Sequence, residues 1–456
     1  MTRHPTAPRH RLPSAATIAA GLLAAVLPAP CVAAQTPSTA PQQAVEPSEG
    51  ERRFREIAEY IRTRGELDAA TRADLVRAAA TLDADLAVPS LARATAVRLL
   101  AIRVQAASLL DDRDAMERAF ARLAELAGSG DALVLAWARE RIGFAEFEAA
   151  HALLEGRAFA ADRRVDADIA RAQALIGLGR FLDAQAALNA TPARRSAQQL
   201  SQIAALSKRI TDLNEAWNAE IVLMARDIRR GDLPLVEIVT PKGPILLELF
   251  EDDAPNTVGN FIEHVERGTY DGTRFHRVLR GFGVQGGDPE TASGAAGGTG
   301  TGGWLIPDEP SRSERRALLS GRVVMASQPE DISAQRPRAN SAGCQFMILV
   351  DHAEELAGSH TPFGRVTEGL EVVRQLGADD AILSARVLRK RDREYRGVRL
   401  EEVSKGDFSM PRRPGTATRA LETRINPPAP PRAPAQPQPV PVNPIDLSPT
   451  RPPAKP

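Results

Sequence analysis

The pattern of apolar residues changes at Gly231-Asp232-Leu233-Pro234, and this change divides the chain into two differently built regions. Before it, residues 51–230 are rich in Ala, Leu, Arg and Glu, contain few prolines and carry apolar residues at helical spacing. After it, short apolar segments alternate with turns that contain Gly and Pro, which is typical of strands. A chain of 456 residues has room for more than one domain. We therefore predict a multidomain protein, with an all-α region at 51–230 and a β-rich domain at 234–406.

Part of the helical region repeats at an offset of 34 residues, since Phe147–Leu154 matches Phe181–Leu188 and Ala138 matches Ala172. This period, with small residues where two helices would pack, resembles the tetratricopeptide repeat, a helix hairpin. Around Leu109–Leu126 the register is lost, so an irregular helical bundle remains an equal alternative. Neither interpretation contains a catalytic constellation, and we expect this region to dock a protein partner.

The first 34 residues predict export. A basic start is followed by the apolar stretch Ala15–Leu27 and by the small residues Val32-Ala33-Ala34, as in a signal peptide cleaved after Ala34. The apolar stretch is shorter than the roughly 20 residues that span a bilayer, which disfavours a retained membrane anchor. We expect the periplasm or cell envelope as location, with lipid anchoring through Cys31 as the alternative, and no integral membrane segment after cleavage.

Two further segments have too little apolar content to fold. Residues 35–50 consist largely of Pro, Ser, Thr, Gln and Glu and are predicted to be a disordered linker. Residues 407–456 are dominated by Pro, Ala and Arg, which favours a disordered, extended C-terminal tail. Lys+Arg and Asp+Glu both total 58, so net charge supports no nucleic acid as a main partner.

Strands and helices of the β-rich domain can be placed in part. Leu235–Val239 and Ile245–Phe250 flank a turn and predict a hairpin. Asn256–Arg267, introduced by Pro255, predicts a short amphipathic helix, and a second helix is expected near Leu370–Leu376. Further strands are predicted at 323–326, 345–350 and 398–403.

The most informative segment runs from Tyr270 to Asp288. It contains Phe275-His276-Arg277, then Phe282 and Gln285, then the turn Gly286-Gly287-Asp288. This order resembles the signature of the cyclophilin family, and the resemblance extends over about residues 235–406. The other matching elements are Glu248-Leu249-Phe250, Pro255–Val258, Asn260-Phe261, Gly300–Gly303, Met325-Ala326, Asn340–Phe346 and His360–Val366. The resemblance implies a cyclophilin-like barrel with two helices that acts as a peptidyl-prolyl cis/trans isomerase on proline-containing polypeptides.

Such a reaction needs neither metal nor cofactor, because no bond is broken or transferred. The partial double bond of an X-Pro amide sets a rotation barrier of roughly 18–20 kcal/mol. A catalyst has to favour the twisted amide, whose nitrogen has regained its lone pair. By the resemblance, Arg277 is the catalytic residue that donates a hydrogen bond to this nitrogen, and Gln285 holds the substrate backbone and Arg277.

The resemblance also assigns substrate-binding residues. Four of them match the apolar slot that receives the proline ring: Phe282, Met347, Leu356 and His360. Two match positions that contact the peptide backbone, Ala326 and Gln345, and two match a loop near the residue before proline, Thr301 and Gly302. Phe275 and His276 are interpreted as structural.

Departures from the family pattern leave a second function open. Gly283 stands where a large apolar residue is usual, Ser327 replaces a common Asn and Met347 a common Phe, and Ser327–Ala339 is an insertion relative to compact members. The alternative is a weakly active or inactive cyclophilin-like scaffold protein whose helical region docks partners. The Arg277 and Gln285 pair instead favours an isomerase that assists the folding of exported proteins.

Overall fold

The computed structural model describes residues 46–64, 67–128, 130–192, 195–294, 297, 300–309, 316–328 and 337–402. The predicted signal peptide, residues 35–45 of the predicted linker, the Pro-rich tail and residues 329–336 of the Ser327–Ala339 insertion lie outside this range. The described part of the predicted linker, residues 46–50, enters a helix at Glu49. Within it, no helix is both long and apolar enough to cross a membrane.

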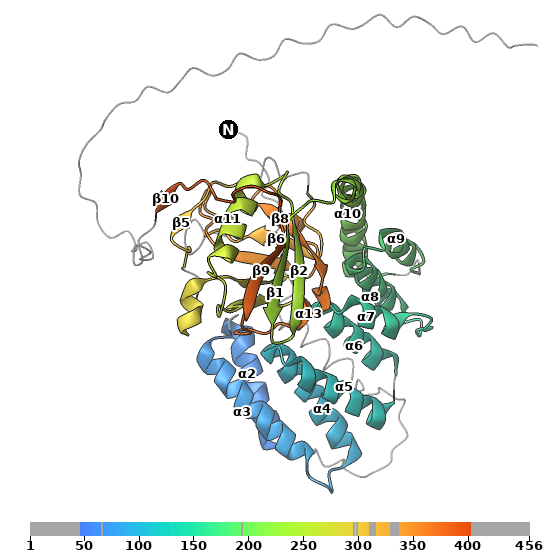
Figure 1. Cartoon of the computed structure of the whole chain (residues 1–456). Coiled ribbons are helices and arrows are strands. Elements are labelled where there is room, and N and C mark those ends of the chain that lie inside the picture. The colour runs from blue at the N-terminus through green and yellow to red at the C-terminus, as the bar shows by residue number, and fades with distance from the viewer. Residues whose placement is uncertain are drawn as a thin grey trace, which may run out of the picture. The chain divides into compact units, whose positions relative to one another are not determined.

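The region before Gly231 is helical, as predicted (Figure 1). Its helices are α2 (Glu49–Arg64), α3 (Ala69–Leu86), α4 (Arg93–Leu110), α5 (Arg113–Ala127), α6 (Asp131–Gly143), α7 (Phe147–Leu154), α8 (Arg164–Gly177), α9 (Phe181–Asn189) and α10 (Ala197–Arg230). The long α10 begins with a capping box, in which Ser196 Oγ accepts from the Gln199 N–H at 3.1 Å and Gln199 Oε1 accepts from the Ser196 N–H at 2.9 Å. It ends at Gly231, whose φ of 64° suits glycine.

Residues that match at the 34-residue offset lie at corresponding positions of successive helices. Phe147 and Phe181 are the first residues of α7 and α9, and Ala138 on α6 and Ala172 on α8 are fully buried. Close packing is required here, because a Cβ atom on Gly177 would lie 2.3 Å from the Phe147 ring. That these hairpins are tetratricopeptide units stays a prediction.

The region after Gly231 is a curled antiparallel sheet (Figure 1). Among the described residues, eight strands form it in the order β3-β4-β7-β6-β8-β2-β1-β9. Hydrogen bonds between residues 272–275 and 379–382, including Phe275 N–H to Asp380 O at 2.9 Å, join the segments before the two edge strands and close the barrel. The strands are β1 (Leu235–Thr240), β2 (Gly243–Leu249), β3 (Arg277–Leu279), β4 (Gly283–Gly286), β6 (Arg322–Met325), β7 (Phe346–Leu349), β8 (Pro362–Glu368) and β9 (Ser384–Arg389).

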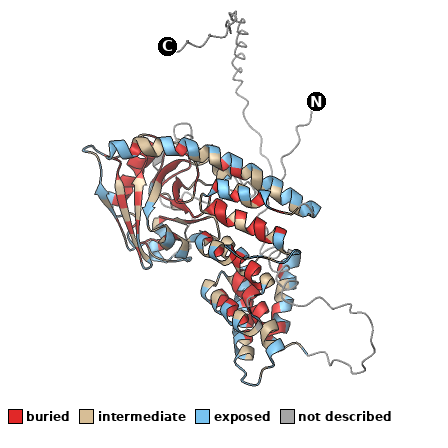
Figure 2. Ribbon diagram, turned by 90° about the vertical axis from the view of Figure 1, so that its right-hand side faces the viewer, coloured by how far each residue is buried: buried red, intermediate tan, exposed pale blue. Residues whose placement is uncertain are grey.

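The barrel core follows from alternation along the strands. In β1, Val236 and Ile238 are fully buried, whereas Leu235 and Glu237 are only half-buried. Helix α11 (Pro255–Glu266) adds its own apolar face to this core, and Pro255 occupies its first turn. Figure 2 shows the buried residues gathered inside the barrel and between the helices.

Several predicted elements are present, and one prediction was wrong. The hairpin, both helices (α11 and α13, Leu370–Gln375) and strands β6 and β7 lie where expected. The strand predicted at 398–403 is reduced to β10 (Glu401–Glu402), which pairs with β5 (Trp304–Leu305), and Val403 lies outside the described residues. The segment before it instead follows α11, where the Val398 N–H donates to Asn256 Oδ1, and Val398 is 66% exposed.

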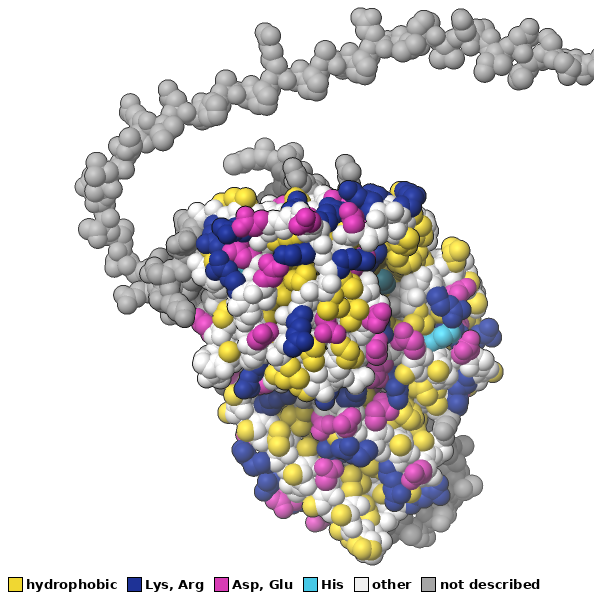
Figure 3. All heavy atoms as spheres, in the orientation of Figure 1, with side chains coloured by type: hydrophobic (Ala, Val, Ile, Leu, Met, Phe, Trp, Pro, Cys, Tyr) yellow, Lys and Arg dark blue, Asp and Glu magenta, His cyan; other side chains and the backbone are white. Residues whose placement is uncertain are grey.

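Helix α10 lies beside the barrel (Figure 1) and packs on it through buried charges. Arg316, with a fully buried side chain, contacts Glu220 and Asp227 of α10 at 3.0 and 2.8 Å, and also Asp253 of the barrel at 2.7 Å. On the face drawn in Figure 3, by contrast, basic and acidic side chains are interspersed with apolar ones.

Candidate active site

Strands β3 and β4 form a hairpin that brings the predicted catalytic pair together. In its register Arg277 lies opposite Gln285. The connecting turn is closed by the Phe282 N–H, which donates to Leu279 O at 2.9 Å, and Gly281 adopts a φ of 66° that favours glycine. Strand β4 continues the sheet to β7, where Gln285 pairs with Met347.

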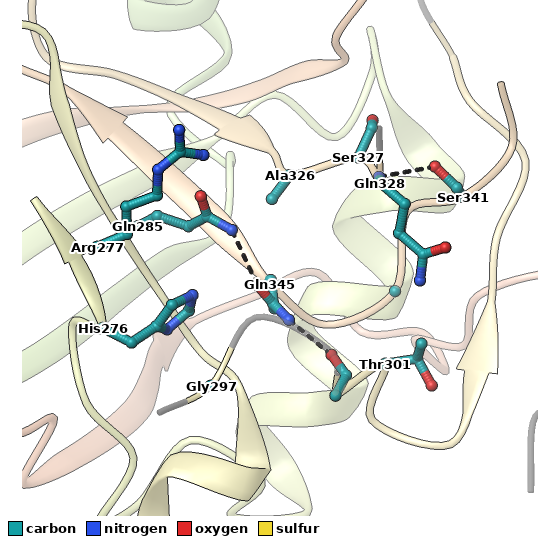
Figure 4. A pocket seen from close by; sticks show the side chains of 12 residues that line it. His276, Arg277, Gln285, Gly297, Thr301, Ala326, Ser327, Gln328, Ser341 and Gln345 are labelled. Atoms are coloured by element: carbon teal, nitrogen blue, oxygen red, sulfur yellow. Dashed lines mark hydrogen bonds between the residues drawn. The ribbon is translucent and has the colours of Figure 1, made fainter. Parts of the chain in front are cut away.

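A pocket of about 330 Å³ opens beside this hairpin. Its lining residues are His276, Arg277, Gln285, Gly297, Gly300, Thr301, Ala326, Ser327, Gln328, Ser341, Gly343 and Gln345. Figure 4 shows Arg277 and His276 on one side, Ser327, Gln328 and Ser341 on the other, and the two glutamine amides between them. The cavity is thus lined by hydrogen-bond donors and acceptors.

A chain of hydrogen bonds orients the two glutamine amides. Gln285 Nε2 donates to Gln345 Oε1 at 2.9 Å, and Gln345 Nε2 donates to Gly300 O at 2.8 Å and to Asp288 Oδ2 at 3.1 Å. Asp288 is fully buried and also accepts the Gly300 N–H at 3.1 Å. An ionised carboxylate can only accept hydrogen bonds, so it fixes the orientation of each amide in turn. The carbonyl oxygen of Gln285 is thereby directed toward Arg277, as Figure 4 shows.

Arg277 is exposed, and its guanidinium makes no hydrogen bond or ion pair with another described residue. Many other arginines of the chain pair with carboxylates, whereas the guanidinium of Arg277 does not. A charged donor that is not engaged by a carboxylate remains available for a ligand in the pocket.

The residues predicted to receive the proline ring form an apolar cluster beside this pocket. Met347 belongs to a buried cluster with Leu318, Val324, Leu349 and Ala353, against which the half-buried Phe282 and Leu356 pack. The fourth predicted residue, His360, lies on the same turn as Leu356, since its N–H donates to Leu356 O at 3.3 Å. Burial lowers the pKa of His360, which favours the neutral ring near pH 7.

The structure thus gathers most predicted site residues, in two adjoining groups. Five of them line the pocket: Arg277, Gln285, Thr301, Ala326 and Gln345. Gly302 does not belong to the lining, and a Cβ atom there would meet the His264 ring at 2.6 Å, so this glycine faces the barrel core.

Other lining residues were not predicted. His276 was interpreted as structural, yet it faces the pocket, and Ser341 Oγ accepts the Gln328 N–H at 2.9 Å on the opposite side. Ser341 and Gly343 lie within the matching segment Asn340–Phe346, which was the signal that could have assigned them. Among the described residues, no group of three or more His, Cys, Asp or Glu side chains could hold a metal ion.

Comparison with known proteins agrees with this geometry. The family model "Cyclophilin type peptidyl-prolyl cis-trans isomerase/CLD" matches residues 235–403. A peptidyl-prolyl cis-trans isomerase of Synechococcus elongatus is 40% identical over 153 residues, which cover 33% of this chain and 92% of that protein. The chain belongs to the cyclophilin-type peptidyl-prolyl cis-trans isomerases.

Other relatives match a similar share of the chain. The peptidyl-prolyl cis-trans isomerase-like 1 protein of Neurospora crassa is 36% identical over 172 residues, covering 35% of this chain and 97% of that protein. A solved cyclophilin structure from Cryptosporidium parvum shares 28% identity, covers 35% of this chain and 99% of that one, and has a TM-score of 0.29. The helices before Gly231 lie outside the residues that the family model matches.

Proposed function

We propose that this cyclophilin isomerises X-Pro bonds of exported polypeptides, assists their folding, and uses Arg277 as its catalytic residue. The observation that carries the proposal is the exposed Arg277 guanidinium, held opposite Gln285 at the edge of a pocket and engaged by no carboxylate of the described residues. An arginine paired with a carboxylate would have its donors occupied. This one can give its hydrogen bond to the substrate.

The chemistry follows from how an amide changes on rotation. In the planar X-Pro bond the nitrogen lone pair is delocalised and accepts no hydrogen bond. At the twisted transition state the lone pair returns to nitrogen, and a donor aimed at it stabilises only that state. Arg277 supplies the donor, while the Gln285 carbonyl oxygen lies on the side of the guanidinium and is fixed by Gln345.

Binding requires that the proline ring stays in place while the preceding residue turns. Phe282 and Leu356, packed against the Met347 cluster, supply an apolar surface for the ring. The polar pocket with Thr301 and Gln345 suits the peptide backbone on the other side of the bond. The small residue Gly283 does not leave a hole, because a Cβ atom there would lie 2.7 Å from Ile348 O.

Refolding of an exported protein whose slow phase is limited by proline isomerisation tests this function. Catalytic amounts of the full chain should accelerate the slow phase, and Arg277→Ala should abolish the acceleration while binding of the unfolded chain persists. Equal acceleration by wild type and Arg277→Ala would contradict the role of Arg277, whereas binding of the unfolded chain without any acceleration by wild type would favour the scaffold alternative.

The location is a separate part of the proposal, supported by the signal-peptide pattern of residues 1–34. A reporter enzyme that is active only outside the cytoplasm, fused after residue 45, should be active with the native leader and inactive when residues 2–34 are deleted. A Cys31→Ser variant that still fractionates as a soluble periplasmic protein would exclude lipid anchoring, whereas release from the membrane by this substitution would favour it.

A protein partner for the helical region also stays a proposal. Exposed apolar side chains on α9 and α10 support it, since Leu182 is 78%, Val222 66% and Ile228 72% exposed. Pull-down with the full chain, compared with a Leu182→Ser, Val222→Ser, Ile228→Ser triple variant, tests it.

A further inference from the structure

The turn between β3 and β4 rests on the helical region. Arg280 lies between Arg277 and Phe282, and its Nη2 donates to Glu140 Oε2 at 2.6 Å while its Nη1 donates to Ser108 Oγ at 2.9 Å. Its guanidinium also stacks on the Phe144 ring, with 3.8 Å between the guanidinium carbon and the ring centroid. Glu140 is 1% exposed, so α6 holds a buried carboxylate whose partner comes from the isomerase hairpin.

The backbones approach each other closely at the same place. A Cβ atom on Gly281 would lie 2.8 Å from Gly143 O, and one on Gly143 would lie 3.2 Å from Arg280 Nη2. Ser108 Oγ in turn donates to Glu140 Oε2 at 2.9 Å, so the arginine enters a preformed polar site rather than a solvated surface. The turn is therefore fixed in position by a fork of hydrogen bonds, a ring contact and backbone packing.

The turn that carries Leu356 is attached to the helical region too. Arg209 on α10 donates from Nε to Glu354 Oε1 at 2.9 Å and from Nη2 to His352 O at 3.1 Å. The His352 ring lies with Nε2 3.0 Å from Ile176 O of α8 and with Nδ1 accepting the Ser320 N–H at 3.2 Å, so Nε2 carries the proton. These residues lead directly into the turn Glu354–Leu356.

We propose that the helical region is part of the scaffold of the isomerase site, with Arg280 and Arg209 as positioning residues. They fix the two turns that carry Phe282 and Leu356, both of which pack against the Met347 cluster proposed to receive the proline ring. The inference rests on the proposed function of that slot. Arg277 itself is held by the β3–β4 ladder, so releasing the turn disturbs ring binding more than the hydrogen bond to the prolyl nitrogen.

This role gives a kinetic signature that a merely stabilising contact lacks. Losing ring binding, which is shared by ground and transition state, raises KM with little change in kcat. For Arg280→Ala in the full chain we expect KM for a short peptide with one Ala-Pro bond to rise about tenfold and kcat to change less than about threefold. Arg280→Lys should give an intermediate KM, because lysine keeps the charge near Glu140 but loses the fork and the ring stacking.

A substitution within the helical region tests the proposal more directly, because it changes no residue of the isomerase domain. Glu140→Gln, in the full chain, should raise KM in the same direction, and adding it to Arg280→Ala should cause no further rise, since both remove one interaction. Arg374→Ala is the matched control. Arg374 on α13 is 13% exposed and pairs with Glu148 of α7, so its loss also weakens contact with the helical region, but at a place that belongs neither to the pocket nor to the apolar cluster.

The measurement is exchange spectroscopy by NMR on the cis and trans peptide, which separates kcat from KM. Unchanged KM in folded Arg280→Ala and Glu140→Gln would overturn the positioning role, and an equal rise in Arg374→Ala would show a general effect of loosening instead. If Arg280→Ala fails to fold, the KM of Glu140→Gln alone decides whether the positioning role holds. Absence of turnover in the wild type would overturn the proposed function together with this inference, whereas an active wild type with unaffected variants overturns the inference only.

Discussion

The barrel and the helical region bury their apolar side chains in different ways. Most buried apolar residues of the barrel belong to one large core, which Ala145 and Phe147 of the helical region join. Aromatic rings meet there at defined angles, such as Phe261 and Phe346, whose centroids lie 5.4 Å apart with the ring planes at 89°. The helical region divides its apolar residues among separate clusters, each made mainly by neighbouring helices, and Leu319 from the region after Gly231 joins one of them. A core shared by most strands is cooperative, whereas stacked helices are stabilised by contacts between neighbours.

Where the two regions meet, buried charges lie beside apolar contacts, such as those of Phe147 with the barrel core and of Leu319 with α8, α9 and α10. Arg316 binds Glu220, Asp227 and Asp253 with no exposed side-chain surface and lies 3.9 Å from the centroid of the Phe250 ring. Burial alone would lower the pKa of Arg316, but the carboxylates of Glu220 and Asp227 outweigh it and raise the pKa. This junction between α10 and the barrel therefore requires a specific arrangement of its charged groups, because a guanidinium fork accepts only one arrangement of its partners.

The largest effect on stability is expected from breaking this junction. Arg316→Ala leaves the carboxylates of Glu220 and Asp227 buried without their main partner, and should lower the free energy of unfolding by about 3–5 kcal/mol in urea denaturation. Arg122→Ala is the control, since Arg122 and Glu125 form an exposed pair (63% exposed each) and should cost less than about 1 kcal/mol. Equal losses in the two variants would mean that the junction contributes no more than a surface pair.

A smaller effect is expected on the pH dependence of stability, through a histidine in the barrel core. Burial, followed by the charges of Arg267 and Arg399, lowers the pKa of His264 in the barrel core to about 3. The unfolded chain binds this proton below about pH 6.5, so stability falls as the pH drops from there toward the folded pKa. Between pH 7 and pH 5 the loss from this group is about 2 kcal/mol.

Replacing the histidine tests this assignment. In His264→Asn the difference in unfolding free energy between pH 7 and pH 5 should shrink by about 2 kcal/mol, although the variant is less stable at both because the stack on Trp304, with centroids 4.4 Å apart, is lost. Burial also lowers the pKa of His352 and of His360, so both should contribute acid sensitivity that remains in His264→Asn. An undiminished pH difference would place the acid-sensitive group elsewhere than in the barrel core.

The smallest effect probes contact between neighbouring helices. Gly177→Ala brings a Cβ atom into the Phe147 ring and should cost about 1 kcal/mol, because overpacking exceeds the gain in helix propensity at the end of α8. Phe147→Leu in the same chain should recover part of the loss. Stabilisation by Gly177→Ala alone, read from the thermal unfolding midpoint, would contradict the close packing of this helix pair.

The sequence predicted the site better than the sheet that carries it. Arg277, Gln285, Ala326 and Gln345 lie in contiguous motifs, and these could be recognised without knowing their strands. Strands β3 and β4 are three and four residues long and flank a glycine turn, and β8 begins with Pro362, so none shows the apolar alternation from which strands are predicted.

The junction was not predicted, for a physical reason. Glu220 and Asp227 stand on a helix and Arg316 follows other charged residues, so each has the pattern of a solvated surface charge. Their burial depends on partners that are 89 to 96 positions away in the sequence. Arg280 was missed likewise, because an arginine beside a turn glycine looks exposed until Glu140 and Phe144 are seen to enclose it.

Turnover of a single-proline peptide by wild type, Arg277→Ala and Arg277→Lys, all as the full chain, tests the central claim most directly. We predict that kcat/KM falls by about a hundredfold or more in Arg277→Ala, as for the loss of one transition-state donor, while the free energy of unfolding is unchanged. Arg277→Lys should not recover the rate, because a point charge lacks the planar fork that reaches the prolyl nitrogen and Gln285 together. Near-wild-type kcat/KM in either variant would contradict the assignment of Arg277 as the catalytic residue.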